Sequence, residues 1–239
     1  VALAVPLIWL LVGGFEGLVN RRGARTAKTG LVAPDVFVPK AQTVREDSPG
    51  ADMTSAIFAI ELDEFSMLSD RFEPAAIDLV LKSIGDRIQS VARDMDTISR
   101  IGDCRYGVCL APVRHLDLES CIQLSGRLQQ AIEEPIAIDG TSVYMSASVG
   151  FCLLTRAPGV TGQDWINGAI AALNEAQRRG PTSVRAYSPE LHSRLKNRAG
   201  LRDEVAIALE RGQIQPWFQP QISTDTGKVS GFEALARWI

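Results

Sequence analysis

The sequence predicts an α/β fold, an α+β sandwich in which helices flank a mostly antiparallel sheet. Three patterns predict it. Residues 55–62 form a nearly continuous apolar run of strand length, which is typical of a strand in the middle of a sheet. Apolar residues recur at spacings of three and four over 74–92, as on one face of a helix. A Gly-Asp pair separates the β-prone runs 97–101 and 106–110, which predicts a hairpin.

The alternation of helices and strands continues along the chain. Apolar residues at helical spacing predict further helices, and the turn signals Asp139-Gly140 and Gly180-Pro181 separate β-prone runs from them. The elements expected here are helices over 117–132 and 163–179 and strands over 136–138, 142–154 and 183–187. This order predicts one layer of sheet covered by helices.

The first 20 residues differ in composition from the rest. Residues 1–15 carry no charge, and a basic cluster over 21–28 follows them, as expected at the cytoplasmic end of a membrane helix. Such a run is shorter than the ~20 residues that span a bilayer. The alternatives are a buried or interfacial helix and a targeting segment. We expect residues 1–20 to be the tail of a transmembrane or membrane-proximal helix in the inner (cytoplasmic) membrane, with the rest in the cytoplasm.

Residues 21–53 are expected to form a basic juxtamembrane segment and a linker. Pro34, Pro39, Pro49 and Gly50 interrupt this stretch, and such residues are typical of turns and loops. The folded domain would then begin at residue 54.

Charge and cysteine content exclude two classes of function. The formal net charge is −3, and residues 1–30 hold four basic side chains against one acidic (+3), so the remainder carries −6. Nucleic-acid affinity comes mainly from neutralised phosphates, and we therefore expect no nucleic-acid partner. The four cysteines form no CxxC pair and no zinc spacing, which predicts buried free thiols in a reducing compartment.

Motifs along residues 54–188 carry a resemblance to a known family. They are the strand ending in Asp63-Glu64-Phe65, Asp78 in the first helix, Arg100-Ile101-Gly102, Ser148-Val149-Gly150, and Ala172-Leu173 with Ala176 before Gly180. In this order and spacing the stretch resembles a GGDEF domain, the nucleotidyl-cyclase-like fold of diguanylate cyclases, which join two GTP molecules into cyclic di-GMP. The resemblance implies a central sheet flanked by helices.

The resemblance locates the catalytic signature, and this signature is degenerate. Gly102 keeps the first glycine, while Asp103, Cys104 and Arg105 stand where the family has its second glycine, an aspartate and the metal-binding glutamate; Tyr106 keeps the aromatic position. A cyclase needs carboxylates that hold a divalent metal against the triphosphate. We therefore expect no catalytic residue in this domain and no cofactor in this chain.

Most other nucleotide contacts implied by the resemblance are also replaced. Glu61 stands where the family has a metal-binding aspartate, and Asp63 keeps the second acid of that strand. Ser66 replaces a phosphate-binding lysine and Ser69 a guanine-binding asparagine, whereas Asp78 keeps its base-contacting type.

Arg105 allows two interpretations. A guanidinium repels Mg²⁺ but can make a forked contact with a phosphate, so Arg105 and Asp78 are the candidates for nucleotide binding, with GTP as the candidate ligand. The alternative is a solvated arginine on an exposed hairpin.

A second candidate site is the RxxD motif formed by Arg93 and Asp96, six residues before Gly102. The resemblance places the family's inhibitory, product-binding site there. Arginine can pair with a guanine edge or a phosphate, and aspartate can accept from guanine nitrogens. The alternative is a structural aspartate that caps or flanks the next strand.

The end of the chain predicts a linking helix over 189–212 and two strands. The segment Gln219-Pro220-Gln221 and the segment over 231–238, Gly-Phe-Glu-Ala-Leu-Ala-Arg-Trp, resemble the first two signatures of EAL domains, the cyclic di-GMP phosphodiesterases. By that resemblance residues 213–239 are the first strands of a truncated EAL domain. Glu233 would be a metal ligand, for Mg or Mn in the complete domain, and Gln219 and Arg237 would contact the substrate.

Three functions are compatible with these patterns. The leading one is a membrane-tethered bacterial signalling protein whose non-catalytic GGDEF domain regulates its own EAL domain, a phosphodiesterase. The alternative is a catalytically dead receptor or scaffold for cyclic di-GMP, and an active diguanylate cyclase is the third. The partners expected are cyclic di-GMP, GTP as a further candidate, the protein's own EAL domain, the membrane and a second copy in a homodimer.

Overall fold

The computed structural model describes residues 31–48, 53–138 and 140–239. The chain divides into two compact units, one that ends at Pro189 and one that begins at Glu190, and each is described by itself. The membrane tail expected over residues 1–20 lies outside the described residues. None of the described helices is both long and apolar enough to cross a bilayer.

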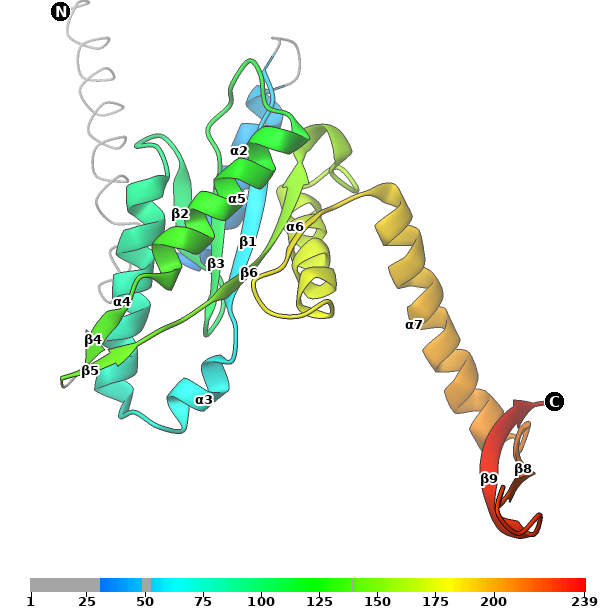
Figure 1. The fold of residues 1–239 in the computed structure, drawn as a ribbon. Helices are drawn as coiled ribbons and strands as arrows, with labels where there is room; N and C mark the ends of the chain where they lie inside the picture. Colours follow the sequence, from blue (N-terminus) through cyan, green and yellow to red (C-terminus); the bar gives the residue numbers. More distant parts are fainter. Residues whose placement is uncertain (1–30, 49–52, 139) are drawn as a thin grey trace, which may run out of the picture. The chain divides into compact units, whose positions relative to one another are not determined.

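The first unit is built on a five-stranded sheet with the order β2-β3-β1-β6-β7 (Figure 1). All neighbours are antiparallel except β6 and β7, which run parallel. The predicted α/β fold with a mostly antiparallel sheet is therefore confirmed. The strands are β1 (Ala56–Leu62), β2 (Thr97–Arg100), β3 (Arg105–Cys109), β6 (Ala147–Leu153) and β7 (Val184–Ala186).

Helices cover both faces of this sheet (Figure 1). α4 (Pro74–Val91) and α5 (Leu118–Glu133) pack together on one face, and α6 (Gly162–Gln177) packs on β1 and β6 from the other. The close approach of α6 requires Gly150, because a Cβ there would lie 2.0 Å from the backbone nitrogen of Leu173. A capping box between Thr161 and Asp164 fixes the start of α6.

The stretch expected to be a linker contains a helix, α2 (Pro34–Asp47). It packs against α6, β2 and β3, and Phe37 and Ala41 are fully buried. The prolines that suggested a linker are compatible with this helix, because Pro34 occupies the first turn, where no backbone N–H is needed. The folded unit therefore includes residues before the expected boundary at residue 54.

The run 142–154, expected to be one strand, is two. β5 (Thr141–Val143) pairs with β4 (Ile136–Ile138) in a separate two-stranded sheet, while β6 joins the main sheet. The chain changes sheets at Ser146, whose carbonyl accepts a 2.9 Å hydrogen bond from the Asp63 amide. Two short helices complete the unit, α3 (Phe65–Ser69) and the 3-10 turn η1 (Leu154–Arg156).

Free cysteines lie inside the first unit, as expected. Cys109, Cys121 and Cys152 are buried and unpaired, and burial raises the pKa of each of these thiols to about 12. Cys104 is half-buried.

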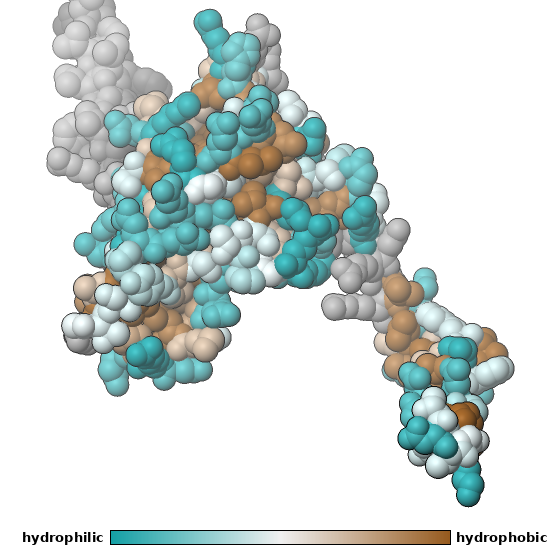
Figure 2. Space-filling model, in the orientation of Figure 1, coloured by the Kyte–Doolittle hydropathy of each residue, from teal (hydrophilic) through white to brown (hydrophobic). Residues whose placement is uncertain are grey.

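The second unit consists of α7 (Pro189–Glu210) and a hairpin of β8 (Ile214–Ile222) and β9 (Val229–Trp238). Cross-strand partners lie on the same side of a sheet, so the register gives this hairpin two different faces. One face is apolar, and Figure 2 shows hydrophobic and hydrophilic side chains exposed side by side at this end of the chain. Its exposed large residues are Phe218, Phe232 and Trp238.

Candidate functional site

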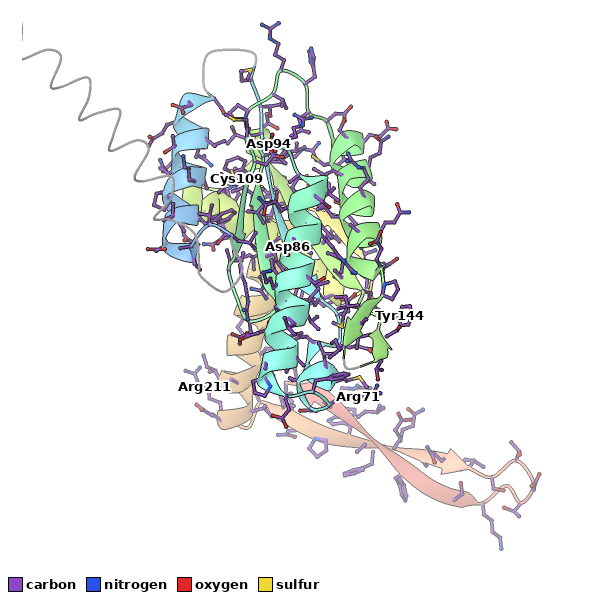
Figure 3. The ribbon with its side chains drawn as sticks, turned by 90° about the vertical axis from the view of Figure 1, so that its left-hand side faces the viewer. Arg71, Asp86, Asp94, Cys109, Tyr144 and Arg211 are labelled. Atoms are coloured by element: carbon purple, nitrogen blue, oxygen red, sulfur yellow. The ribbon has the colours of Figure 1, made fainter. Side chains whose placement is uncertain are left out.

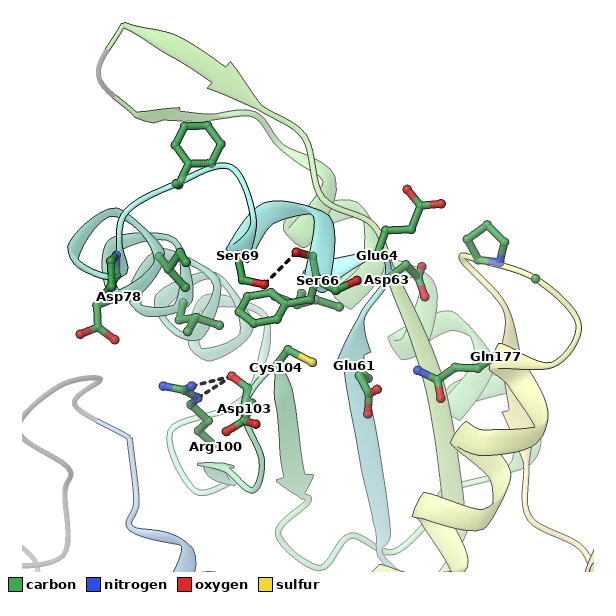
Figure 4. A pocket seen from close by; sticks show the side chains of 18 residues that line it. Glu61, Asp63, Glu64, Ser66, Ser69, Asp78, Arg100, Asp103, Cys104 and Gln177 are labelled. Carbon is green, nitrogen blue, oxygen red and sulfur yellow. Dashed lines mark hydrogen bonds between the residues drawn. The ribbon is translucent and has the colours of Figure 1, made fainter.

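A cavity of about 970 Å³ opens where β1 meets α3, the first half of α4 and the tip of the β2–β3 hairpin (Figure 4). Phe65, Phe72 and Leu81 give it an apolar wall. Among the described residues that line it, one is basic, Arg100, and five are acidic. The acidic lining residues are Glu61, Asp63, Glu64, Asp78 and Asp103.

Glu61 and Arg105, which stand at two metal-ligand positions by the resemblance, form an ion pair with each other. They are directly opposite in the register of β1 and β3. The Nε and Nη2 atoms of Arg105 both lie 2.5 Å from Oε2 of Glu61. The side chains are 29% and 19% exposed, so water screens the pair only in part. Of the two interpretations of Arg105, a solvated arginine does not fit this contact.

Asp63, the acid at the end of β1, accepts hydrogen bonds from three protein donors. Its Oδ1 accepts from the hydroxyl of Ser148 at 2.7 Å. Its Oδ2 accepts from the hydroxyl of Ser146 at 2.8 Å and from the backbone amide of Thr182 at 2.9 Å. The carboxylate thereby ties the end of β1 to the start of β6 and to the loop before β7.

The hairpin tip is held by its own arginine. Nε of Arg100 donates to the carbonyl oxygens of Gly102 and Asp103 at 3.1 and 3.0 Å, and Nη2 donates to Asp103 as well (Figure 4). All three of these hydrogen bonds join the guanidinium of Arg100 to backbone carbonyl oxygens of the hairpin tip. Cys104 lies beside Arg100 in the wall, and burial, followed by the charge of Glu61, raises the pKa of its thiol.

Tyr106 belongs to the core and not to the cavity. It is fully buried, and its hydroxyl donates to the carbonyl oxygen of Leu81 in α4 at 2.7 Å. Burial raises the pKa of this phenol. The aromatic position of the signature thus anchors β3 to α4.

The side of the cavity formed by α3 carries the hydroxyls of Ser66 and Ser69. Ser69 donates to the carbonyl oxygen of Ser66 at 2.8 Å, which closes the short helix on itself (Figure 4). Gln177, at the end of α6, lines the opposite side. A triphosphate would meet acidic side chains here with little positive charge to balance it.

The side chains of this cavity do not fit a divalent metal ion. Mg²⁺ requires oxygen ligands with available lone pairs, but Glu61 is paired with a guanidinium and Asp63 accepts three hydrogen bonds. Within the described parts of the chain, no group of three or more His, Cys, Asp or Glu is placed to hold a metal.

The family model described as "Diguanylate cyclase, GGDEF domain" matches residues 28–183. The chain belongs to the GGDEF family. The matched residues begin before α2 and so include this helix, which lies in the stretch expected to be a linker before residue 54.

Relatives and solved structures agree with this assignment. Cyclic di-GMP phosphodiesterase NbdA of Pseudomonas aeruginosa is 31% identical over 204 residues, 85% of this chain and 25% of NbdA. The bifunctional diguanylate cyclase/cyclic di-GMP phosphodiesterase MucR of the same organism is 27% identical over 187 residues, 78% of this chain and 27% of MucR. This chain spans about a quarter of the length of these curated relatives. The solved GGDEF domain of TpbB (YfiN), also from P. aeruginosa, aligns with a TM-score of 0.67 at 24% identity, covering 72% of this chain and 99% of that one.

The RxxD motif lies at the other end of α4 from the cavity of the GGDEF domain. Figure 3 shows Asp94 at one end of this helix and Arg71, near α3, at the other. Asp96 accepts hydrogen bonds from the backbone amides of Arg93 and Ala111, both at 2.8 Å. Each oxygen of its carboxylate therefore already accepts one hydrogen bond from the backbone. Arg93 is exposed and, with Asp96, lines a hollow of about 300 Å³.

The three candidate residues of the second unit share one face of the hairpin. Gln219 lies directly opposite Glu233, and Arg237 lies opposite Gln215. All of these side chains are on the face opposite to Phe218 and are exposed. The structure thus brings the candidate metal ligand and the two candidate substrate contacts together on one face of the hairpin, called here the polar face, which also carries the exposed Trp217.

Sequence reasoning missed the partners of the two acids on β1. Ser146 and Ser148 were not considered as partners of Asp63, although β6 was expected to lie in the same sheet. The Glu61–Arg105 pair did leave a signal, because residues of opposite charge stand at the two positions that the resemblance assigns to metal ligands. Asp78 lines the cavity, whereas Arg105 points to Glu61 and is not among the lining residues.

Proposed function

We propose that this GGDEF domain is a non-catalytic regulator in a membrane-tethered cyclic di-GMP signalling protein, and that the EAL domain of that protein hydrolyses cyclic di-GMP. The ion pair between Glu61 and Arg105 carries the first part of the proposal. Phosphoryl transfer needs a metal ion that neutralises charge on the triphosphate. A guanidinium bound to Glu61, beside an Asp63 whose two oxygens already accept three hydrogen bonds, disfavours a metal ion at this position.

The hairpin supports the second part. An enzyme that cleaves a phosphodiester with metal ions needs a carboxylate ligand and polar groups that hold the substrate. Glu233, Gln219 and Arg237 provide these types of group on one face, while the opposite face is apolar and suited to packing. NbdA, a relative with 31% identity, is a cyclic di-GMP phosphodiesterase by name.

The proposal implies a set of partners. Cyclic di-GMP would bind the polar face of the completed EAL domain, with Mg or Mn held by Glu233 and by further ligands. The GGDEF domain would act on the EAL domain of the same protein, as a monomer or a homodimer, and residues 1–20 would anchor the protein in the inner membrane. GTP is a candidate ligand for the GGDEF cavity.

The full-length protein that contains this chain tests the proposal. We expect it to hydrolyse cyclic di-GMP to the linear dinucleotide and to produce no cyclic di-GMP from GTP. Glu233→Gln should abolish hydrolysis, because it removes a charged metal ligand. The matched control is Glu210→Gln at the end of α7, which removes the same charge away from the polar face and should leave hydrolysis unchanged. Equal hydrolysis by both variants would remove Glu233 from the proposed site.

A further inference from the structure

We infer that Arg105 is a built-in cation that takes the place of a divalent metal ion at Glu61, in the wall of the cavity, so that the cavity gives no advantage to a metal-bound polyphosphate. This deepens the proposed non-catalytic function and rests on it. Arg105 does not line the cavity, and it acts as a positioning residue through Glu61, which does.

The geometry of the pair is that of a cation bound at a defined position. Two nitrogens of Arg105 contact the same oxygen of Glu61, and the strand register places the two residues face to face. A guanidinium is always charged and has a fixed planar arrangement of donors. It therefore satisfies Glu61 at every physiological pH without any ion from solution.

A divalent ion has no second position nearby. An ion at Glu61 would lie within a few ångströms of the guanidinium, where like charges repel strongly in a partly buried site. At Asp63, the hydroxyls of Ser146 and Ser148 direct their hydrogens at the carboxylate. An ion there would have to displace both hydroxyls.

The same charges determine which ligands the cavity rejects. A polyphosphate brings several negative charges, and it would enter a wall of carboxylates with one arginine, Arg100, whose guanidinium is held by carbonyl oxygens. These charges disfavour a polyphosphate, and without a position for a metal ion nothing offsets the repulsion. The cavity should therefore bind a nucleotide such as GTP no better when the nucleotide carries a metal ion than when it does not.

Titration with Mn²⁺ alone tests whether Arg105 takes the place of a divalent metal ion. Arg105→Glu would place two carboxylates opposite each other on β1 and β3, and we expect it to bind Mn²⁺ at least tenfold more tightly than the wild type. Arg127→Glu, an exposed residue on α5, makes the same change of charge away from the cavity and should behave as the wild type. Calorimetry, with circular dichroism to verify folding, provides the measurement.

A charge-swapped variant makes the test specific to the pair. Glu61→Arg combined with Arg105→Glu rebuilds the ion pair in reverse, and we expect Mn²⁺ affinity to return to the wild-type value. If Arg105→Glu does not fold, Arg105→Ala serves in its place and should also gain Mn²⁺ affinity. Wild-type binding as tight as that of Arg105→Glu, or equally tight binding by the swapped variant, would overturn the inference.

A second experiment measures the affinity of the protein for GTP with and without Mn²⁺. In the wild type, saturating Mn²⁺ should raise GTP affinity by less than twofold, and an increase of tenfold or more would contradict the inference. The experiments distinguish failure of this inference from failure of the proposed function. Mn²⁺ binding by the wild type without turnover would refute the replacement alone, whereas formation of cyclic di-GMP would refute the non-catalytic role.

Discussion

The guanidinium of Arg105 lies across β1 and β3 from Glu61 and binds one oxygen of that carboxylate through two nitrogens, each 2.5 Å away. The carboxylate of Glu61 therefore has an internal counter-charge, fixed by the register of the two strands. Under the proposed function, this counter-charge stands where a cyclase would hold a metal ion.

Breaking the pair should destabilise the domain more than removing it. Arg105→Met leaves the carboxylate of Glu61 unpaired at 19% exposure, and we expect it to lower the free energy of unfolding by about 1–3 kcal/mol. Arg105→Met with Glu61→Gln removes both charges and should cost less than the sum of the two single changes. Urea denaturation of the wild type and the three variants measures this, and strictly additive losses would mean that the pair contributes nothing.

Asp63 should matter for stability and not for metal binding. Asp63→Ala removes the acceptor of Ser146, Ser148 and the Thr182 amide, and we expect a loss of about 2 kcal/mol or more, because several donors lose their partner together. Asp70→Ala, an exposed aspartate at the end of α3, is the control and should change the unfolding midpoint little. A midpoint for Asp63→Ala equal to that of the control would show that the three hydrogen bonds have no net value.

Helix α2 should be an integral part of the domain. Phe37 is fully buried and packs on Gly107, where a Cβ would lie 2.7 Å from its ring. Phe37→Ala should therefore lower the free energy of unfolding by about 3–5 kcal/mol, while Lys40→Ala on the exposed side of the helix should have little effect. Thermal unfolding compares the two, and an unchanged midpoint for Phe37→Ala would be evidence that α2 is only loosely attached.

The capping box of α6 should make stability depend on pH in the acidic range. Hydrogen bonds from the side chain and then the backbone of Thr161 hold the pKa of Asp164 below its usual range. A lowered pKa in the folded state means that the stabilisation is complete above the unfolded-state pKa, about 4, and is lost as the pH falls through the folded-state value. Asp164→Asn should lower the melting temperature at pH 7, and this difference should shrink as the pH is lowered below the unfolded-state pKa. A difference that stays constant over the whole acidic range in which the domain is folded would contradict this assignment.

The succession of helices and strands could be predicted because each strongly periodic segment buries one face. Helix α4 was expected over 74–92 and ends at Val91, since its apolar spacing alone determines it. Helix α2 could not be predicted in this way. Its burial depends on Phe37 meeting Gly107, a contact between residues 70 positions apart, and its prolines resemble those of a linker.

The site was predictable to the level of residue types and no further. The expectation that metal-binding acids are missing came from reading Gly102 to Tyr106 against the family signature. The pairing of Arg105 with Glu61 depends on the register of two strands, and the hydrogen bonds that Asp63 accepts depend on where β6 begins. Such relationships arise from tertiary packing, which single-sequence patterns do not specify.

Synthesis of cyclic di-GMP from GTP tests the non-catalytic role most directly. The purified chain would be incubated with GTP and Mg²⁺ or Mn²⁺, and the products separated by chromatography beside an active diguanylate cyclase as positive control. We predict no cyclic di-GMP above the level of a protein-free blank. Arg105 neutralises the carboxylate of Glu61, and the hydrogen-bond donors around Asp63 compete with a metal ion for its oxygens. Cyclic di-GMP that increases in proportion to the concentration of this chain would contradict that role.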